Sequence, residues 1–317
     1  MAVRWGGASP EHLDACVVAL GEIEAVDRTG EVIGRRELEE ELGLSYVDPD
    51  LDVLLGWEGE RVVAWGSVVC IPSARQRRVM LEGAVVPDRR RTGLGAELLA
   101  WQMARGAEVA AGRGPDAPGW LEVSASTGDV AREALFAAQG FTPLRYYLEM
   151  RRPLTDVPAF ELPDGEVRIE PFDFVHDDAL RLVHNEAFRD HFASSELDEE
   201  TWQTWVTGDH QFRADCSFIA FAGDEIVGYA INAIHPDDWP ALGFTEGWTH
   251  QLGVRRPWRG RGLARSLLRA TATAFVGEGL DYAALDVDAE NPTGALGLYE
   301  SEGYRRDKTR VAWSRAV

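Results

Sequence analysis

Two stretches of the chain place arginines and glycines between a strand-like run and a helix-like run. They are VVPDRRRTGLGAELL (85–99) and VRRPWRGRGLARSLL (254–268). The first backbone N–H groups of a helix have no partner within the helix and carry a partial positive charge. A glycine-rich turn before such a helix lets the backbone approach an anion closely, and arginines add positive charge. Each stretch therefore predicts a cradle for a pyrophosphate.

Two better-known phosphate-binding motifs do not fit these stretches. The dinucleotide fold expects G-x-G-x-x-G early in a βαβ unit, whereas here an arginine precedes the glycines and a predicted antiparallel hairpin precedes the strand. The P-loop requires a Gly-Lys-Ser/Thr sequence. The chain has a single lysine, Lys308, which lies far from both stretches.

The cradle stretches are part of a longer repeat. Arg259 lies 169 positions after Arg90, and Gly262 lies 169 positions after Gly93. This period is that of two similar domains in tandem, not of a short-period solenoid.

A second pair of segments follows the cradles at a smaller offset. ALFAAQGF (134–141) resembles GLYESEGY (297–304), at an offset of 163 positions. The first half therefore holds six more residues between its two motifs, and we expect them in the glycine- and proline-rich segment 110–120.

A proline-rich segment divides the two halves. Residues 151–167 contain prolines at positions 153, 158 and 163, a density that resists regular structure and marks a linker. We predict an N-terminal domain over 1–157 and a C-terminal domain over 158–317. In each half, short alternating runs predict strands and apolar residues at helical spacing predict helices. The expected fold class is α+β: two tandem domains, each a mixed, mainly antiparallel sheet flanked by helices.

The composition limits the classes of partner. The formal net charge of −21 repels phosphate backbones, so we expect no nucleic acid partner. No apolar run has the length of a membrane span, and the N-terminus does not read as a signal peptide, so we expect neither membrane association nor export. Three widely spaced cysteines suit neither a disulfide framework nor a metal site, which favours reduced thiols in the cytoplasm.

The cradles and the segments that follow them resemble the GNAT-type (Gcn5-related) N-acetyltransferases. One mark of that family is a strand ending in V-x-x-x-x-[RQ]-x-x-G-x-[GA] before a helix, and a second is N-x-x-x-A-x-x-x-Y-x-x-x-G-[FY] farther on. The first mark is matched by Val254, Arg259, Gly262 and Ala264, and by Val85, Arg90, Gly93 and Gly95; the second is matched by Asn291, Ala295, Tyr299, Gly303 and Tyr304.

The resemblance implies acetyl-coenzyme A as the cofactor. Its pyrophosphate would lie on the backbone of 259–264, and its pantetheine arm would pair with the end of the strand over 247–254. Backbone N–H groups of that strand could also hold the thioester carbonyl as an oxyanion site. The implied cofactor residues are Leu252, Gly253, Val254, Arg259, Gly260, Arg261, Gly262, Leu263, Ala264 and Asn291, with Val85, Arg90, Arg91, Thr92, Gly93, Leu94 and Gly95 in the first half.

Acetyl transfer to an amine requires an acid for the leaving thiolate and a base for the amine. The resemblance implies Tyr299 as the acid. Counting back in twos from Val254 gives Leu252, His250, Trp248 and Glu246, which alternation would place on one face of a strand. This count leaves His250 and Glu246 as alternative bases.

The first half lacks these groups. Phe136 stands where the second half has Tyr299, and the matching count from Val85 gives only Gly83, Leu81 and Val79. We therefore expect the C-terminal domain to be catalytic, and the N-terminal domain to bind acetyl-coenzyme A at most.

The expected partner is a small-molecule amine. We expect the early helices of the second half to line its pocket, through His184, Glu186, Asp190 and His191. A monomer with an internal pseudo-dimer is expected. A non-catalytic coenzyme A sensor and a protein lysine acetyltransferase remain alternatives.

Overall fold

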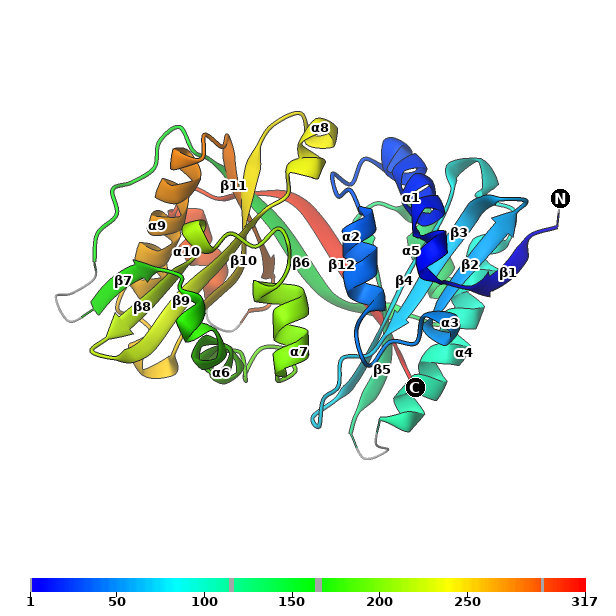
Figure 1. Cartoon of the computed structure of the whole chain (residues 1–317), viewed down its shortest axis with the longest axis horizontal. Helices are drawn as coiled ribbons and strands as arrows, with labels where there is room; N and C mark the ends of the chain where they lie inside the picture. The colour runs from blue at the N-terminus through cyan, green and yellow to red at the C-terminus, as the bar shows by residue number, and fades with distance from the viewer. Residues whose placement is uncertain (1, 114–116, 163–166, 292–293) are drawn as a thin grey trace. The chain divides into compact units, whose positions relative to one another are not determined.

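The computed structural model describes residues 2–113, 117–162, 167–291 and 294–317 (Figure 1). The chain forms two compact units: unit 1 comprises Met1–Arg145 and Val311–Val317, and unit 2 comprises Tyr146–Arg310. Parts of the predicted insertion and linker, residues 114–116 and 163–166, lie outside the described residues.

Unit 1 is built from strands and helices in the order that the repeat predicts. Its strands are β1 (Arg4–Gly7), β2 (Val53–Glu58), β3 (Arg61–Val69), β4 (Arg77–Val85), β5 (Gly119–Ser126) and the first residues of β6 (Thr142–Pro153). Its helices are α1 (Leu13–Asp27), α2 (Arg35–Leu42), α3 (Pro49–Asp52), α4 (Leu94–Gly112) and α5 (Val130–Ala138).

The strands of unit 1 follow the order β1-β2-β3-β4-β5, and β12 (Arg305–Ala316), whose last residues belong to unit 1, lies next to β5. Strands β1 to β4 pair antiparallel, and β4 and β5 pair in parallel. Gly66 on β3 and Gly83 on β4 face Leu98 and Gln102 of α4, while Trp65 packs with the residues of α1. Helices therefore cover both faces of the sheet.

Unit 2 repeats this order. Its strands are β7 (Val167–Pro171), β8 (Phe218–Ala222), β9 (Glu225–Ile234), β10 (Glu246–Val254), β11 (Tyr282–Asp288) and the first part of β12 (Arg305–Ala316). Its helices are α6 (Asp177–Ala187), α7 (Glu199–Trp202), α8 (Trp239–Leu242), α9 (Leu263–Gly277) and α10 (Ala295–Ser301).

The sheet of unit 2 has the order β6-β11-β10-β9-β8-β7. Strand β8 pairs antiparallel with β7 and with β9, and β9 pairs antiparallel with β10. Strand β10 pairs with β11 in parallel. Leu263 and Leu267 of α9 pack on one face, and Leu180 of α6 and Trp202 of α7 pack with Tyr229 on the other. The expected fold class, a mixed and mainly antiparallel sheet flanked by helices in each half, is confirmed.

The chain first passes from unit 1 to unit 2 between Arg145 and Tyr146, whereas the predicted domain division lies at 157/158. Strand β6 begins in unit 1 and continues into unit 2, where Tyr147 to Pro153 pair with Asp288 to Tyr282 of β11. The end of β12, from Val311, belongs in turn to unit 1. A strand belongs to the unit whose sheet edge it covers. Strand β6 already covers the edge of unit 2 before the chain reaches the proline-rich segment, so the unit boundary lies earlier than predicted.

Strand β10 approaches α9 closely because it has no side chain at Gly247. An added Cβ there would lie 2.6 Å from the ring of Phe275. We expect Gly247→Ala to lower the free energy of unfolding by about 1–3 kcal/mol, since the overpacked ring must move. Urea-induced unfolding of the purified protein measures this change.

The matched control is Gly277→Ala at the end of α9, where an added Cβ meets nothing within 4 Å. This change should be neutral or stabilising by up to about 1 kcal/mol, because alanine loses less backbone entropy than glycine. Equal destabilisation by both substitutions would contradict the close approach at Gly247.

Candidate active site

The parallel pairing of β10 with β11 ends halfway along β10. It runs from Glu246 opposite Tyr282 to Thr249 opposite Leu285. The pairing of β10 with β9 on its other side continues to Val254. Beyond Thr249, β10 therefore has no strand pairing to β11 among the described residues, and an extended ligand can pair with that edge. Unit 1 repeats the feature, because β4 pairs with β5 only over Arg77–Met80.

A β-bulge lies where β10 and β11 separate. Thr249 pairs with Asn232 and Gln251 pairs with the preceding residue of β9, Ile231, so His250 is the extra residue. The corresponding strand of unit 1, β4, pairs with β3 from Met80 to Val85 without a shift. The two halves therefore differ in this strand: β10 has a bulge at His250, one of the predicted bases, and β4 has none.

The bulge corrects one expectation. The side of β10 at Gly247 faces Phe275 of α9, whereas the side at Gly253 faces Tyr229 on the opposite face of the sheet. Residues six apart in an unbroken strand share a face. Leu252 and Val254 therefore lie on the α9 face, while Glu246 and Trp248 lie on the α6 face. The five residues that alternation placed together are divided between two faces.

The predicted cradle of unit 2 has the backbone geometry that the glycines suggest. Helix α9 begins at Leu263, after Gly262 with φ of 83° and Gly260 with φ of 76°. Both angles lie in the left-handed region that favours glycine. Within the described part of the chain, no side-chain hydrogen bond caps the start of α9, so its first N–H groups are available to an anion.

The arginines of this turn divide into two kinds. Arg259 donates from Nε to the carbonyl of Val254 (3.0 Å) and from its terminal nitrogen to the carbonyl of Ala187 (2.9 Å). It ties the turn to the end of α6. Arg261 is exposed, with its guanidinium 4.7 Å from the centre of the Trp258 ring, and is positioned to meet an anion.

Two more arginines strengthen the same tether. Arg255 pairs with Glu186 at 2.8 Å, and Arg256 pairs with Asp190. Glu186 and Asp190, which we expected in the acceptor pocket, are thus held by the cradle turn.

The cradle of unit 1 is formed in a similar way. Arg90 donates to the carbonyl of Val85 (3.0 Å) and makes two bonds to Asp27, the last residue of α1 (2.6 and 2.9 Å). Gly93 precedes α4 with φ of 97°. Arg91, at the position of Gly260, has φ of 63°, and a side chain in this conformation costs about 1–2 kcal/mol.

The remaining first-half cofactor candidates follow this turn. Leu94 is buried at the start of α4. Thr92 donates its hydroxyl to the carbonyl of Arg89 (2.6 Å), and a Cβ added at Gly95 would lie 3.7 Å from the side chain of Leu135, an ordinary contact distance.

Tyr299 lies on α10 with 8% of its surface exposed. Its ring packs against Tyr304 (6.0 Å between centres) and belongs to the same apolar cluster as Leu252, on the α9 face. Burial raises the pKa of Tyr299 to about 12, so the hydroxyl stays protonated at neutral pH. Asn291 lies in the turn before α10, where its N–H donates to the carbonyl of Asp288 (3.0 Å).

The residue at the corresponding place in unit 1 is Phe136, which is 7% exposed. Its ring packs against Phe141 and Trp313, each at 6.2 Å between centres. This position has no proton to donate.

Glu246 is not brought to the open edge of β10. It is 2% exposed and lies in the paired half of the strand. Arg151 donates to both of its oxygens (2.5 and 3.1 Å), and Trp248 donates from Nε1 to one of them (2.9 Å). The structure favours a stabilising role for this carboxylate.

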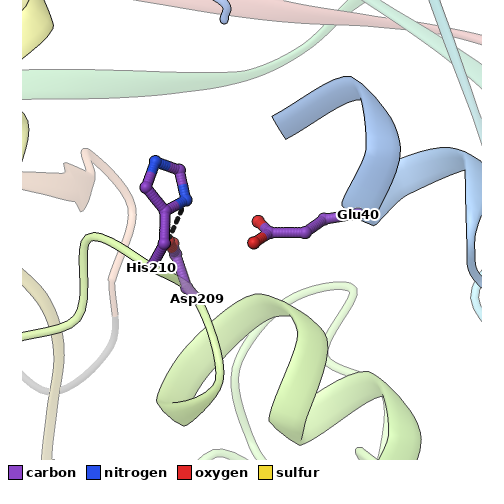
Figure 2. Close-up of side chains that lie close together, drawn as sticks. All are labelled: Glu40, Asp209 and His210. Atoms are coloured by element: carbon purple, nitrogen blue, oxygen red, sulfur yellow. Dashed lines mark ion pairs between the residues drawn. The ribbon is translucent and has the colours of Figure 1, made fainter. Parts of the chain in front are cut away.

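His250 is the extra residue of the bulge and has a neighbour that the sequence did not indicate. Its Nε2 lies 3.1 Å from Nε2 of His235, just after β9. Desolvation lowers the pKa of His250, while Asp209 and Asp286 act to raise it. Asp209 also pairs with His210 at 3.5 Å (Figure 2).

The other two residues that we expected in the acceptor pocket are His184 and His191. His184 is buried, its Nδ1 lies 2.7 Å from the hydroxyl of Tyr229, and burial lowers its pKa to about 4. His191 is half-buried, and burial followed by the charge of Arg259 lowers its pKa.

Unit 1 contains a carboxyl that sequence reasoning missed. Burial, reinforced by the charge of Glu82, raises the pKa of Glu41 on α2 to about 7. The face of β4 that we inspected for a base, which carries Gly83, packs against α4; Glu82 projects from the other face.

None of the helices in the described ranges combines the length and apolar character of a bilayer-spanning segment.

Comparison with known proteins identifies the family. The model described as the acetyltransferase (GNAT) family matches residues 178–304. A mycothiol acetyltransferase of Thermobispora bispora is 32% identical over 310 residues, covering 94% of this chain and 95% of the relative. One from Thermomonospora curvata is 34% identical over 234 residues, covering 71% and 70%.

Solved structures share the fold along the whole chain. A GCN5-related N-acetyltransferase from Sphaerobacter thermophilus matches with a TM-score of 0.74 at 21% identity, covering 99% of this chain and 95% of its own. A tandem GNAT protein from the clavulanic acid biosynthesis pathway matches with a TM-score of 0.71 at 16% identity, covering 99% and 98%.

The chain belongs to the GNAT acetyltransferase family. Within it, the chain is a tandem GNAT protein and an N-acetyltransferase, of a family that uses acetyl-coenzyme A.

The different contacts of Arg259 and Arg261 lead to a prediction. Arg259→Ala removes the donors to two backbone carbonyls and should lower the free energy of unfolding by about 1–3 kcal/mol. Arg261→Ala should change it by no more than about 0.5 kcal/mol, because the side chain is exposed. Thermal unfolding with and without coenzyme A measures both effects.

Coenzyme A should stabilise the wild type more than the Arg261→Ala variant, since ligand binding raises stability in proportion to the logarithm of affinity. A stable Arg259→Ala variant, or equal ligand effects in wild type and Arg261→Ala, would contradict these assignments.

Proposed function

We propose that the C-terminal half of the chain catalyses acetyl transfer from acetyl-coenzyme A to the primary amine of a small molecule. The observation that supports this most is the open edge of β10 beyond Thr249. Tyr299 belongs to the same apolar cluster as Leu252 on the α9 face, and His250 lies beside Trp248, which is on the other face. An acid and a base on opposite sides of a thioester suit its two proton transfers.

The proposed binding mode uses backbone groups for most contacts. The pyrophosphate lies against the first turn of α9, over residues 260–264, with Arg261 adding charge. The pantetheine arm pairs with the open edge over 251–254. A backbone N–H on this edge polarises the thioester carbonyl as the attacking nitrogen adds to it.

The proposed proton transfers balance the reaction. His250 removes one proton from the acceptor ammonium, the free amine attacks the thioester carbon, and the nitrogen of the adduct then loses its second proton to solvent. The C–S bond then breaks, and the Tyr299 hydroxyl protonates the departing thiolate. Solvent restores the proton of Tyr299 and takes the one held by His250.

We assign coenzyme binding without turnover to the N-terminal half. Its cradle has the same backbone form, with Arg90 in the place of Arg259. Phe136 cannot serve as an acid, and β4 lacks the bulge that presents His250. The halves thus share the means of binding and differ in the means of catalysis.

The acceptor is proposed from the relatives. Two relatives that match over most of this chain are named mycothiol acetyltransferases, so the acceptor of that reaction is the first amine to test. We propose the cytoplasm as the compartment, since Cys16, Cys70 and Cys216 are buried free thiols.

Tyr299→Phe tests the assignment of the acid. The change should lower kcat by about 10²–10⁴-fold, the usual contribution of a positioned acid, with little effect on coenzyme A affinity. Release of the coenzyme A thiol, followed with small amines and with lysine peptides, measures the rate and separates the two acceptor classes.

The matched control is Tyr304→Phe. The hydroxyl of Tyr304 is buried without a hydrogen-bond partner among the described residues, so its removal should leave activity and stability near those of wild type. Full activity of Tyr299→Phe would exclude Tyr299 as the acid. An absence of turnover with every amine, despite coenzyme A binding, would favour a coenzyme sensor.

The pKa of Tyr299 predicts the alkaline side of the pH profile. An ordinary tyrosine is half ionised at about pH 10. Burial raises the pKa of Tyr299 to about 12, so the protonated acid persists above that pH. We expect kcat to show no tyrosine-dependent fall below about pH 11. A fall near pH 10 that vanishes in Tyr299→Phe would contradict the raised pKa.

A further inference from the structure

Two histidine side chains meet at the bulge of β10. The Nε2 atoms of His235 and His250 lie 3.1 Å apart, and the ring planes are 26° from parallel with centres 5.1 Å apart. A separation of 3.1 Å between two ring nitrogens is that of a hydrogen bond. One ring therefore donates to the other through these two atoms.

The charged and titratable groups around the pair come from several elements. The carboxylates of Asp209 and of Asp286 on β11 act to raise the pKa of His250. Burial, His250 and His210 lower the pKa of His235 to about 3. Desolvation outweighs the carboxylates and lowers the pKa of His250 also. Both rings are accordingly neutral at neutral pH, and each carries one N–H.

Two neutral imidazoles can share this hydrogen bond in two ways. If His235 donates, the N–H of His250 lies on Nδ1, and that ring has no lone pair left for an amine proton. If His250 donates from Nε2, its Nδ1 keeps a lone pair and can act as a base. The direction of one hydrogen bond thus decides whether His250 can perform the role given to it above.

We propose that His235 is a positioning residue that accepts a hydrogen bond from Nε2 of His250 and so leaves Nδ1 of His250 as the basic atom. This inference rests on the proposed function, which makes His250 the base. In the transfer step, Nδ1 of His250 takes the proton from the acceptor ammonium, and Nε2–H keeps its bond to His235. Burial and the neighbouring histidines lower the pKa of His235, which disfavours passing the proton on to it, and solvent then removes the proton from His250.

The first experiment measures the tautomer without reference to activity. Nitrogen NMR of histidine-labelled full-length protein reports which ring nitrogens carry hydrogen. We expect His250 to be protonated at Nε2 and not at Nδ1 in the wild type. In His235→Leu the acceptor is lost, and a mixture of both tautomers is expected. A wild-type His250 protonated at Nδ1 would overturn the proposal.

The second experiment uses three substitutions at His235. Leu removes the acceptor and should lower kcat at least about tenfold while the KM for acetyl-coenzyme A stays near wild type. Asn supplies a side-chain oxygen as acceptor and should recover most of the lost rate. Asp supplies a charged acceptor, which should raise the pKa of His250 and move the acid side of the kcat/KM profile to higher pH.

A purely structural role for His235 would give a different result. It would lower the rate in all three variants to similar extents and leave the acid side of the profile in place. His176→Asn is the control, because His176 also packs against a ring, that of Phe221, at the start of α6 and away from the bulge. It should leave both rate and pH profile unchanged.

The outcomes separate this inference from the function on which it rests. Full activity in His250→Gln would remove the base from the proposed function, whatever the tautomer. The inference alone would be overturned by a different pair of results. These are a loss of rate in His250→Gln together with the wild-type rate and pH profile in His235→Leu.

Discussion

The site depends on a single extra residue in β10. His250 interrupts the pairing with β9, so the side chains before and after it change faces. Strand β10 pairs with β11 through Glu246–Thr249 and has a free edge beyond that point, an arrangement that β4 shares without a bulge, so the bulge sets which side chains accompany the edge. Because a sheet edge offers backbone donors and acceptors in a row, it can bind an extended chain with few specific side chains. The same irregularity places Leu252 on the face of the apolar cluster that includes Tyr299, and it places His250 where its Nε2 lies 3.1 Å from Nε2 of His235.

Much of this arrangement could be predicted from the sequence, because it depends on local patterns. The strand and helix around 254–268 and the left-handed glycines 260 and 262 follow from residue types and spacing. The sequence did not predict which face of the sheet His250 lies on. A bulge arises from the pairing of two strands, and the sequence of one strand alone carries no reliable sign of it. His235 was missed because it lies 15 positions before His250, and only the folded chain brings the two ring nitrogens within 3.1 Å of each other.

The arginines show how residue type alone can mislead about role. Arg259 has the charge expected of an anion ligand, yet two backbone carbonyls accept its hydrogen bonds. Arg90 is likewise held by Val85 and Asp27. In both halves this arginine ties the turn to the end of a preceding helix. In the binding mode proposed above, these two residues contribute by holding the backbone in place, and a charge count cannot reveal that.

The two halves differ in a way that the physics of each task explains. A cradle is made mainly of backbone, so it tolerates substitution; even the left-handed position of Gly260 accepts Arg91 in the first half at a cost of about 1–2 kcal/mol. Proton transfer depends on single groups, and one change from hydroxyl to hydrogen, as between Tyr299 and Phe136, removes the donor entirely. A base also depends on its tautomer, which a neighbouring acceptor must hold. Catalysis in a duplicated domain can therefore be lost by one substitution, while the capacity to bind the coenzyme persists through many.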